Sequence, residues 1–391
     1  MWAELRLPKI LGHHANFIKA VLSERKTMYS YRIFNKLRSA LLFLLLLLIP
    51  LQSLKAENHK LENGTITAIQ DIRVGHYTDA ESLTGCTVIR FGAEGVPAAV
   101  SVQGSAPGTR ETDLLDPINL VDKIHAIVLS GGSAYGLDAA SGVMVCLEQE
   151  NIGLPVGEGI VVPIVPAAVL FDLNIGNPRV RPSAKWGLLA CQKADSSPVQ
   201  MGNVGAGTGA TVGKLLGRNR AMKSGLGSAL LRLPGGVLVG ALVAVNALGD
   251  VLDTDTGRIL AGIRGDEAGS FQSSVKVVLD QGVKDIFPGT NTTIGIVATN
   301  IPLTKTQLKK VAQMAHDGMA RVISPAHTMY DGDTIFAVSV PVQKGVPEAA
   351  SADSVNLAGT AAAEVMARAI INAVKQAKSV RDCPAASDWK K

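Results

Sequence analysis

The chain has 391 residues, a formal net charge of +5, and 47% hydrophobic but only 4% aromatic residues. This is the composition of a globular protein with a core of small and β-branched side chains, which suits a layered α/β architecture. Residues 1–56 contain nine Lys and Arg against two Glu, a surplus of seven, so the remaining residues carry a net charge of −2. The body of the protein therefore lacks the basic surplus of nucleic-acid-binding proteins, and we expect no nucleic-acid partner.

Residues 1–56 have the pattern of a signal peptide. The basic stretch 32–38 precedes the apolar run 40–49, which is about half as long as the roughly twenty residues that span a membrane. An uncleaved membrane anchor is the alternative, and the shortness of the run argues against it. The charged segment is long if translation begins at Met1, so Met28 is an alternative start. We expect a periplasmic or secreted protein with no membrane contact after signal removal.

The first half of the remaining chain alternates predicted strands with glycine-bearing turns. Strands are predicted for 66–75, 85–91, 97–102 and 125–129, and helices for 118–123 and 137–148. The apolar run 161–170 contains Pro163 and Pro166, which argues against a central strand there.

The sequence Gly131-Gly132-Ser133-Ala134-Tyr135-Gly136 links a predicted strand to a predicted helix. A nucleophile elbow needs the pattern G-x-S-x-G, and Tyr135 stands where the second glycine is required, so that interpretation fails. Two interpretations stay open. Either backbone N–H groups line an anion or substrate pocket at the helix start, with Ser133 and Tyr135 as pocket walls, or the segment is a packing turn without a ligand.

Residues 202–210 (GNVGAGTGA) match only the relaxed form of the dinucleotide-binding fingerprint. Because no clear strand precedes them and no acidic residue follows about twenty positions later, we reject a Rossmann interpretation. The glycines instead allow the backbone to pass close to an active site, with Lys214 at the end of the segment.

Asn246 interrupts the long apolar strand predicted for 236–249. A buried amide costs free energy unless it is hydrogen-bonded, so Asn246 either caps the turn after the strand or points its amide at a reactive group. The next segment, 250–287, is polar, and we expect it to be exposed and partly disordered.

A turn-forming stretch at 288–291 leads into the β-branched run 292–299, with a pair of threonines at the junction. An N-terminal threonine carries a hydroxyl nucleophile and an amine base in one residue. Self-cleavage after Asn291 would give Thr292 both groups. We therefore hypothesise that the chain cuts itself at this junction.

Two helices are predicted in the last part of the chain, one capped by Thr304 and one at about 354–377. The first has an apolar face formed by Leu308, Val311, Ala312, Ala315, Met319 and Val322. This spacing of three and four predicts packing against a sheet. His316 lies next to that face, and we assign it a structural role.

Asp331 and Asp333 stand at the entrance to a predicted strand. Residues two apart in extended backbone point to the same side, so the two carboxylates are expected to lie close together. Such a pair raises its own proton affinity unless a cation lies between its members. The alternative is an Asx-type turn before the strand.

The four cysteines, Cys86, Cys146, Cys191 and Cys383, are widely spaced and contain no CxxC pair. We predict neither a zinc site nor a disulfide framework, and we expect buried free thiols. No cofactor or metal is expected.

Four segments together resemble the L-aminopeptidase/D-esterase family, which includes β-peptidyl aminopeptidases and the nylon-oligomer endohydrolase. They are 131–137 (GGSAYGL), 202–209 (GNVGAGTG), 291–299 (NTTIGIVAT) and 330–334 (YDGDT). The resemblance covers roughly residues 65–378. It implies a four-layer αββα fold like that of N-terminal nucleophile hydrolases, with altered strand connectivity. It also implies self-cleavage between Asn291 and Thr292, giving an α chain of about 57–291 and a β chain of 292–391 in one domain.

The resemblance assigns roles to single residues. It places the nucleophile at Thr292, a pair of acidic groups at Asp331 and Asp333, a catalytic-site lysine at Lys214 and an oxyanion-stabilising amide at Asn246. Phe171 stands where relatives of defined activity carry a pocket tyrosine, so the resemblance does not carry their substrate assignment over to this chain.

These features predict an aminopeptidase or amidase that acts on small peptides or related amides and assembles as a homo-oligomer of αβ units. Two alternatives are an ornithine-type acetyltransferase, which also cleaves itself before a threonine, and a non-enzymatic binding protein that keeps the fold.

Overall fold

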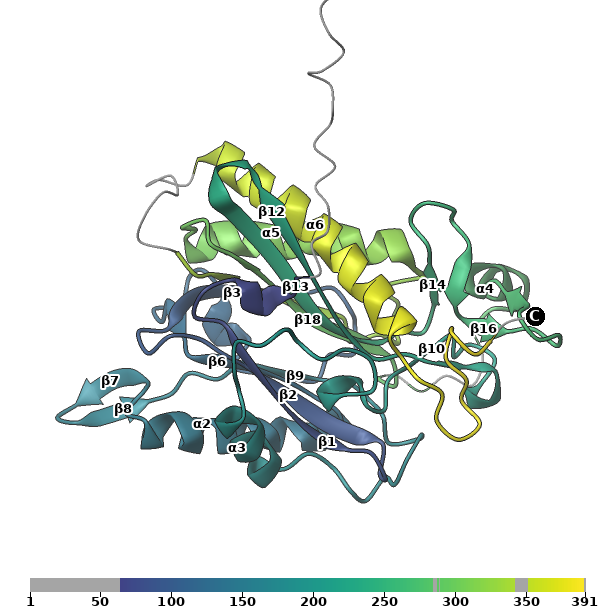
Figure 1. Ribbon diagram of the computed structural model, residues 1–391, viewed down its shortest axis with the longest axis horizontal. Coiled ribbons are helices and arrows are strands. Elements are labelled where there is room, and N and C mark those ends of the chain that lie inside the picture. Colours follow the sequence, from purple (N-terminus) through teal and green to yellow (C-terminus); the bar gives the residue numbers. More distant parts are fainter. Residues whose placement is uncertain (1–63, 284–286, 288, 342–350, 390–391) are drawn as a thin grey trace, which may run out of the picture. The chain divides into compact units, whose positions relative to one another are not determined.

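The computed structural model describes residues 64–283, 287, 289–341 and 351–389. All of them belong to a single unit, Leu61–Lys391. The predicted signal peptide lies outside the described residues. Two β-sheets lie face to face in this unit, and helices cover the outer face of each sheet (Figure 1).

Each of the two stacked sheets has a mixed strand order. The first runs β1 (Arg73–Asp79), β2 (Thr84–Arg90), β6 (Ala126–Ser130), β9 (Ala167–Val169), β4 (Thr109–Arg110). The second runs β12 (Leu226–Leu233), β13 (Val237–Asn246), β18 (Thr292–Thr299), β20 (Thr334–Ser339), β3 (Val96–Val102), β5 (Lys123–Ile124). Strands β18 and β20 pair in parallel, whereas β18 and β13 are antiparallel.

Two pairs of helices form the outer layers. Helices α2 (Ala139–Gln149) and α3 (Ala184–Gln192) cover the first sheet, and α5 (Lys305–Val322) and α6 (Ala352–Lys375) cover the second. The four-layer αββα arrangement predicted from the sequence is confirmed.

Short elements decorate this framework. They are the hairpin β7 (Leu154–Gly157) and β8 (Ile160–Val162), the pair β10 (Thr211–Val212) and β11 (Met222–Lys223), the strands β14 (Asp250–Leu252), β15 (Ile259–Ala261) and β19 (Ile323–Ser324), the pair β16 (Ile263–Arg264) and β17 (Phe271–Gln272), and helix α4 (Ser274–Gln281).

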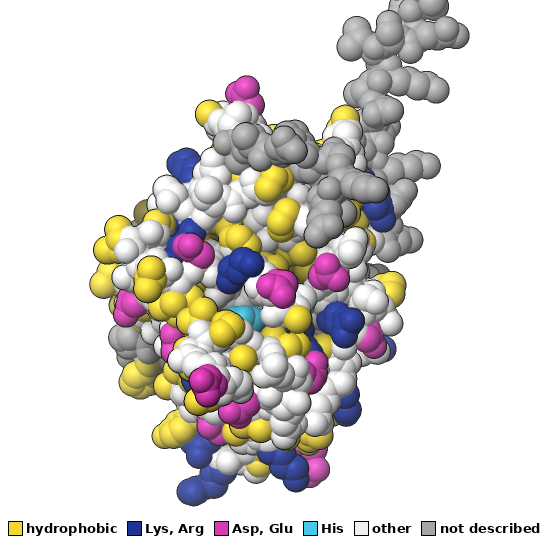
Figure 2. All heavy atoms as spheres, turned by 90° about the vertical axis from the view of Figure 1, so that its left-hand side faces the viewer, with side chains coloured by type: hydrophobic (Ala, Val, Ile, Leu, Met, Phe, Trp, Pro, Cys, Tyr) yellow, Lys and Arg dark blue, Asp and Glu magenta, His cyan; other side chains and the backbone are white. Residues whose placement is uncertain are grey.

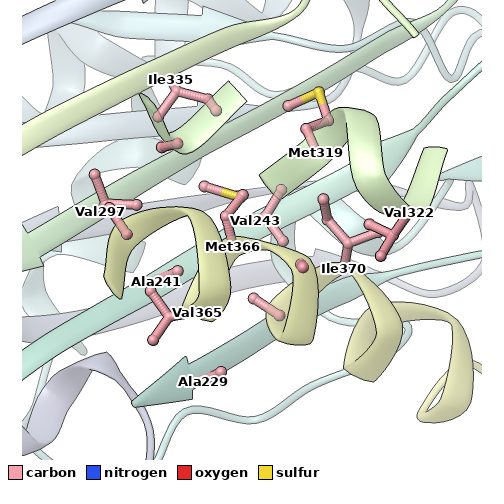
Figure 3. Packing of buried hydrophobic residues seen from close by; sticks show 14 of the residues in the cluster. Ala229, Ala241, Val243, Val297, Met319, Val322, Ile335, Val365, Met366 and Ile370 are labelled. Atoms are coloured by element: carbon pink, nitrogen blue, oxygen red, sulfur yellow. The ribbon is translucent and has the colours of Figure 1, made fainter. Parts of the chain in front are cut away.

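The alternation of side chains along the central strands separates two of the three main cores. On β18, Ile294 and Ile296 pack between the sheets, while Val297 points to the helices, and every residue of the strand is buried. Figure 3 shows Val297 together with Val243 of β13, Ile335 of β20 and the methionines of α5 and α6. A strand buried on both faces is apolar throughout, which explains the long uninterrupted runs in the sequence.

Helix α5 follows its prediction. The Thr304 hydroxyl oxygen accepts a hydrogen bond from the backbone N–H of Gln307, and the Gln307 side-chain oxygen accepts one from the backbone N–H of Thr304, which completes a capping box. The six apolar residues predicted to face a sheet are all buried in the core between the helices and β13.

Helix α6 has the length and hydropathy of a membrane span, with 24 residues and a mean hydropathy of 1.3, but 67% of that window is buried inside the protein. The helix contacts α5, β12 and β13. Its apolar character therefore serves the core, because the second sheet needs a hydrophobic cover.

The helix predicted at 118–123 is wrong. Ile118 and Leu120 are 90% and 94% exposed, and the segment ends in the short strand β5. The ammonium of the distant Lys305 accounts for this difference, because it donates to the carbonyl oxygens of Leu114, Asn119 and Val121 at 2.9 Å each. Carbonyls held by an ammonium group are not free to form helical hydrogen bonds.

Two strand predictions also need correction. The segment 66–75 begins with a 3-10 turn, Ile66–Ala68, and β1 starts only at Arg73. Its buried residues Ile66, Ile69 and Ile72 repeat every third position and not every second, so a strand pattern was absent. Conversely, the run 161–170 was predicted to contain no central strand, but it contains β9, which lies between β6 and β4. Pro166 directly precedes β9, and a proline just before a strand removes no hydrogen bond from it.

The segment 250–287 was predicted to be exposed and partly disordered. Many of its described residues are exposed, among them 254–258, 266–268 and 279–282, but they belong to a set of strands and helix α4 around a buried carboxylate. Asp250 is 2% exposed and accepts hydrogen bonds from the backbone N–H groups of Ile263 and Ser274 and from the Ser274 hydroxyl. Some polar residues of this segment therefore form an internal hydrogen-bond network, which the composition of the segment does not reveal.

The cysteines are not four free thiols. Cys146 of α2 and Cys191 of α3 form a disulfide with a Cα–Cα distance of 6.4 Å, whereas Cys86 and Cys383 are free and buried as predicted. The prediction failed because two helices 45 residues apart along the chain pack side by side. Spacing along the sequence does not reveal such a contact.

Acidic and basic side chains are interspersed with hydrophobic ones on the face shown in Figure 2. The absence of a nucleic-acid partner stays a prediction.

We expect the Cys146–Cys191 disulfide to stabilise the fold by about 3–4 kcal/mol, because it closes a loop of roughly 45 residues in the unfolded chain. The double variant Cys146→Ala/Cys191→Ala should lose that amount in urea denaturation. Cys86→Ala is the control, since it removes a buried thiol without a cross-link. Alkylation of the unfolded, unreduced protein should label two cysteines, and labelling of all four would contradict the disulfide.

Candidate active site

Strand register brings the predicted site residues together. Thr292 is the first residue of β18 and pairs with Asn246, the last residue of β13. A further bridge joins Asn291 to Asp331, just before β20. Thr292, Asn246, Asp331 and Asp333 are each at most 2% exposed. The site therefore lies inside the sheet layer, at one end of its three central strands.

The carbonyl of Asn291 lies next to the Thr292 hydroxyl and is held by a backbone donor. The Gly332 N–H donates to the Asn291 oxygen at 2.9 Å, and the Thr292 hydroxyl donates to the same oxygen. A backbone N–H aimed at a carbonyl oxygen stabilises the negative charge that forms when a nucleophile attacks the carbon. Sequence analysis missed Gly332, although its position between the two aspartates was a signal.

Lys214 and Asn246 hold the segment before the proposed cleavage point. The Lys214 ammonium donates to the carbonyl oxygens of Asn246 at 2.8 Å and Thr290 at 3.2 Å. The Asn246 amide nitrogen lies 3.0 Å from the Phe171 carbonyl oxygen and 3.5 Å from that of Thr290. Asn246 therefore contacts the residue before Asn291, and its role as an oxyanion donor stays a prediction.

The glycine-rich segment 202–210 leads directly to this cluster. The next N–H, that of Thr211, donates to Asn246 Oδ1 at 3.1 Å. Lys223 is fully buried and its ammonium donates to the carbonyl oxygens of Gly207 and Ala210. Burial lowers the pKa of Lys223 to about 7. Lys223 thus fixes the peptide that orients Asn246, a role that sequence analysis did not find.

The two aspartates have different partners. Asp333 accepts the Thr293 N–H on Oδ1 at 2.7 Å, and its Oδ2 contacts the His327 N–H and ring. Asp331 Oδ2 accepts from the backbone N–H and hydroxyl of Thr328. Asp331 thus accepts from a residue three positions before it and not from one after it, so the contact is not an Asx turn. The two carboxylates lie in one buried site, where the charge of Asp333 acts on Asp331.

Burial and charge move the proton affinities of two groups toward neutral pH. Burial, followed by the charge of Asp333, raises the pKa of Asp331 to about 6. Burial lowers the pKa of Lys214 to about 7, against the opposing attraction of Asp331. Groups with such values exchange protons readily near neutral pH, which is typical of catalytic sites.

The turn at 131–136 packs against an internal carboxylate. Gly132 N–H donates to Asp172 Oδ1 at 2.7 Å, and Thr84 donates to Asp172 Oδ2 at 2.7 Å. The backbone donor that was a candidate for ligand binding is therefore already occupied, which favours the packing interpretation. Ser133 N–H bonds the Leu170 carbonyl, and Tyr135 is 61% exposed beneath the Arg181 guanidinium.

Phe171 reaches the site through its backbone, since its carbonyl accepts the Asn246 amide. A cavity of about 160 Å³ opens beside Thr290 and Asn291. It is lined by Asn174, Ile175, Thr211, Lys214, Gly217, Arg218, Ala221 and Phe287 as well. The cavity offers a place for a small group next to the Asn291 carbonyl.

Most of the sequence matches the model of one known protein family. The model described as Peptidase family S58 matches residues 64–385. The chain belongs to peptidase family S58. The resemblance to the L-aminopeptidase/D-esterase family is thereby confirmed, and this S58 protein is a hydrolase of the aminopeptidase or amidase class.

Relatives and solved structures cover most of the S58 chain. It is 42% identical over 345 residues to an uncharacterized aminopeptidase of Mycobacterium tuberculosis (strain H37Rv), covering 83% of this chain and 97% of the relative. It is 32% identical over 313 residues to a 6-aminohexanoate-oligomer endohydrolase of Kocuria sp. (strain KY2), covering 78% and 84%.

The fold matches that of an L-aminopeptidase D-Ala-esterase/amidase from Ochrobactrum anthropi, described as a new variant among the Ntn hydrolase fold. The TM-score is 0.62 at 20% identity, covering 83% of this chain and 91% of that one. At this identity the likeness concerns the fold alone. It agrees with the αββα layers of the S58 chain.

We expect Gly332→Ala to disturb the site locally. An added Cβ would lie 2.7 Å from the Ala106 carbonyl oxygen and 3.0 Å from the Thr292 hydroxyl, so the loop must shift and misplace the Gly332 N–H. Any self-cleavage at Asn291 should slow by at least about tenfold, as when an oxyanion donor is lost. Gly157→Ala on β7 is the matched control, because its added Cβ meets only the Ile160 side chain at 3.9 Å. Equal cleavage rates in the two variants would contradict this geometry.

Proposed function

We propose that the chain is an autoprocessed amide hydrolase whose nucleophile is Thr292, released by cleavage of the Asn291–Thr292 bond. One observation carries the proposal: the Thr292 hydroxyl lies against the Asn291 carbonyl while the Gly332 N–H holds the same oxygen. A nucleophile, a polarised carbonyl and a fixed donor are thus already together in the uncut chain.

Self-cleavage would proceed through an ester. The Thr292 oxygen bonds to the Asn291 carbonyl carbon, the carbon–nitrogen bond breaks, and the hydroxyl proton ends on the released Thr292 amine. Water then hydrolyses the ester, which leaves a carboxylate on Asn291 and restores the hydroxyl. Lys214 and Asp331 have the proton affinities suited to carrying that proton near neutral pH.

The mature site would repeat this chemistry on a substrate. The substrate carbonyl takes the place of the Asn291 carbonyl, with its oxygen on the Gly332 N–H. The Thr292 amine, with a reference pKa near 8, accepts the hydroxyl proton when neutral. Asp331 and Asp333 lie beside it and stabilise the ammonium form after transfer. Asn246 is a second candidate donor to the oxyanion.

The relatives support an amide substrate. Two of those described above are named an aminopeptidase and a 6-aminohexanoate-oligomer endohydrolase. Both names describe hydrolysis of amide bonds, and the second names an oligomer as its substrate. We therefore propose that the enzyme acts on small peptides or related linear amides. We also propose that the enzyme assembles as a homo-oligomer of αβ units, as the family resemblance implies.

We also propose export from the cytoplasm. The signal-like pattern of residues 1–56 motivates the proposal, and the Cys146–Cys191 disulfide supports it, because disulfides persist mainly in oxidising compartments. Cell fractionation with an antibody to the protein tests it, and a purely cytoplasmic signal would contradict it.

Purified protein should separate into two fragments on a denaturing gel, and the smaller should begin Thr-Thr-Ile-Gly. Thr292→Ala should remain a single chain because it lacks the attacking oxygen. Thr293→Val is the control: within the described part of the chain the Thr293 hydroxyl has no hydrogen-bond partner, and valine keeps the β-branched shape. Cleavage in Thr292→Ala, or its loss only in Thr293→Val, would exclude Thr292 as the nucleophile.

The processed enzyme should hydrolyse aminoacyl p-nitroanilides or 6-aminohexanoate oligomers, and the choice between them identifies the substrate class. Because the neutral amine is the base, kcat/KM should rise with pH up to the pKa of the Thr292 amine, near 8 in a model peptide and shifted by its neighbours. A kcat/KM that falls as the pH rises from 5 to 7 would contradict an amine base.

A further inference from the structure

His327 contacts Asp333 with two separate donors. Its ring nitrogen Nδ1 lies 2.8 Å from Asp333 Oδ2, and its backbone N–H donates to the same oxygen at 3.2 Å. The other oxygen of Asp333 accepts the Thr293 N–H at 2.7 Å. His327 is thus connected through one carboxylate to the residue next to Thr292.

We propose that His327 is a positioning residue of the S58 site: it fixes the Asp333 carboxylate and supplies the positive charge that balances it. The proposal rests on the proposed role of Thr292, because its effect on catalysis passes through the Thr292 amine.

The need for a balancing charge follows from burial. Asp333 is 2% exposed, and a buried carboxylate stays ionised only when it is paired and hydrogen-bonded. The His327 ring contacts Asp333 directly and forms an ion pair with it when protonated; the two side chains are 23% and 3% exposed. Burial alone would lower the pKa of His327, but the hydrogen bond and charge of Asp333 outweigh burial and raise it above 6.5.

The backbone of His327 is shaped for this contact. Its φ is 56°, in the left-handed region that residues other than glycine adopt uncommonly, although Asn, Asp and His do so more often than the rest. This conformation directs both the backbone N–H and the ring toward one carboxylate oxygen. A residue held in such a conformation marks a place where the surrounding structure imposes the geometry.

A second histidine lies against the outer side of this ring. The rings of His316 and His327 meet edge to face with centroids 4.8 Å apart, and His316 Nε2 lies 3.0 Å from the Ser101 carbonyl oxygen. Burial lowers the pKa of His316 to about 4, so His316 is neutral near pH 7 and does not compete for the charge.

A cavity of about 290 Å³ opens on this side and is lined by both histidines. The charged or titratable groups around His327 are Asp331 and Asp333 on its own loop and His316, Asp317 and Lys310 on α5.

A positively charged His327 has a consequence with a definite sign. Without it, Lys214 would be left to balance the charges of both Asp331 and Asp333, so more of the Asp333 charge would act on the Thr292 amine, favour its protonated form and raise its pKa. The neutral amine needed for catalysis would then appear only at higher pH.

The test replaces His327 with residues that accept its backbone conformation. His327→Asn keeps a neutral donor near the Nδ1 position but removes the charge, and His327→Gly removes both. We expect the acid limb of the kcat/KM profile of His327→Asn to move up by at least about one pH unit, which is a tenfold loss on that limb. His327→Gly should show the same shift with a lower kcat.

His76→Asn is the matched control. His76 is a half-buried histidine of β1 whose ring bonds only Thr87 among the described residues, so the variant should keep the wild-type profile. A purely structural role for His327 would lower the amount of folded protein without moving the acid limb. An unshifted acid limb in His327→Asn overturns the proposal.

A second measurement does not depend on catalysis. In the Thr292→Ala background, which keeps the chain uncut, NMR titration of the histidine rings should show the His327 midpoint falling by at least about one pH unit when Asp333→Asn is added. The His327→Gly spectrum assigns the signal. An unchanged midpoint overturns the proposal, whereas absence of hydrolysis by the wild type would overturn only the proposed function.

Discussion

The register of β13, β18 and β20 is the constraint on which the site depends. Thr292 faces Asn246 because β18 and β13 pair without interruption from Val239↔Thr299 to Asn246↔Thr292. Parallel pairing with β20 brings Asp331 and Asp333 to the same end. A slip of one residue would turn every side chain of β18 to the opposite face. The apolar cores on both sides of the sheet therefore fix the catalytic geometry together with the fold.

Charge balance is the second constraint, because the charged side chains of the site are buried. Two buried carboxylates lie near one buried ammonium, that of Lys214, and near His327. Lys214 and the two carboxylates are held by backbone atoms: Lys214 by two carbonyls, Asp333 by the Thr293 N–H and Asp331 by the Thr328 N–H. Preorganised backbone dipoles of this kind stabilise charge without needing to reorient during a reaction.

The sequence predicted those features that depend on local pattern. The apolar runs of β13 and β18 and the Thr304 cap were within reach, because each leaves a signal in consecutive residues. The four-layer fold was implied by the family resemblance of four motifs. The Lys305 contacts that keep 118–123 from forming a helix, and the Cys146–Cys191 bridge, were not predicted. Each joins residues tens or hundreds of positions apart, and only tertiary packing brings them together.

In the candidate site, too, some residues leave a local signal in the sequence and others do not. Thr292 has a local signal, since hydroxyls at a strand entrance stand out in an apolar run. Its partners Lys214 and Asn246 were assigned through family resemblance, because nothing in the chain between 214 and 292 relates them. Gly332 and His327 were missed for different reasons. Gly332 acts through its backbone N–H, and His327 acts through a left-handed backbone conformation that a single histidine does not reveal.

The central sheet also explains how a cut chain would stay assembled. Cleavage after Asn291 would fall at the very start of β18, so the ladders to β13 and β20 would remain complete. The β18 side chains would keep both of their cores, and the Lys214 bond to the Thr290 carbonyl would hold the new chain end nearby. Only one peptide bond would be lost. The freed Thr292 amine would therefore appear where the carboxylates already lie, and pairing of β18 on both sides would keep it there.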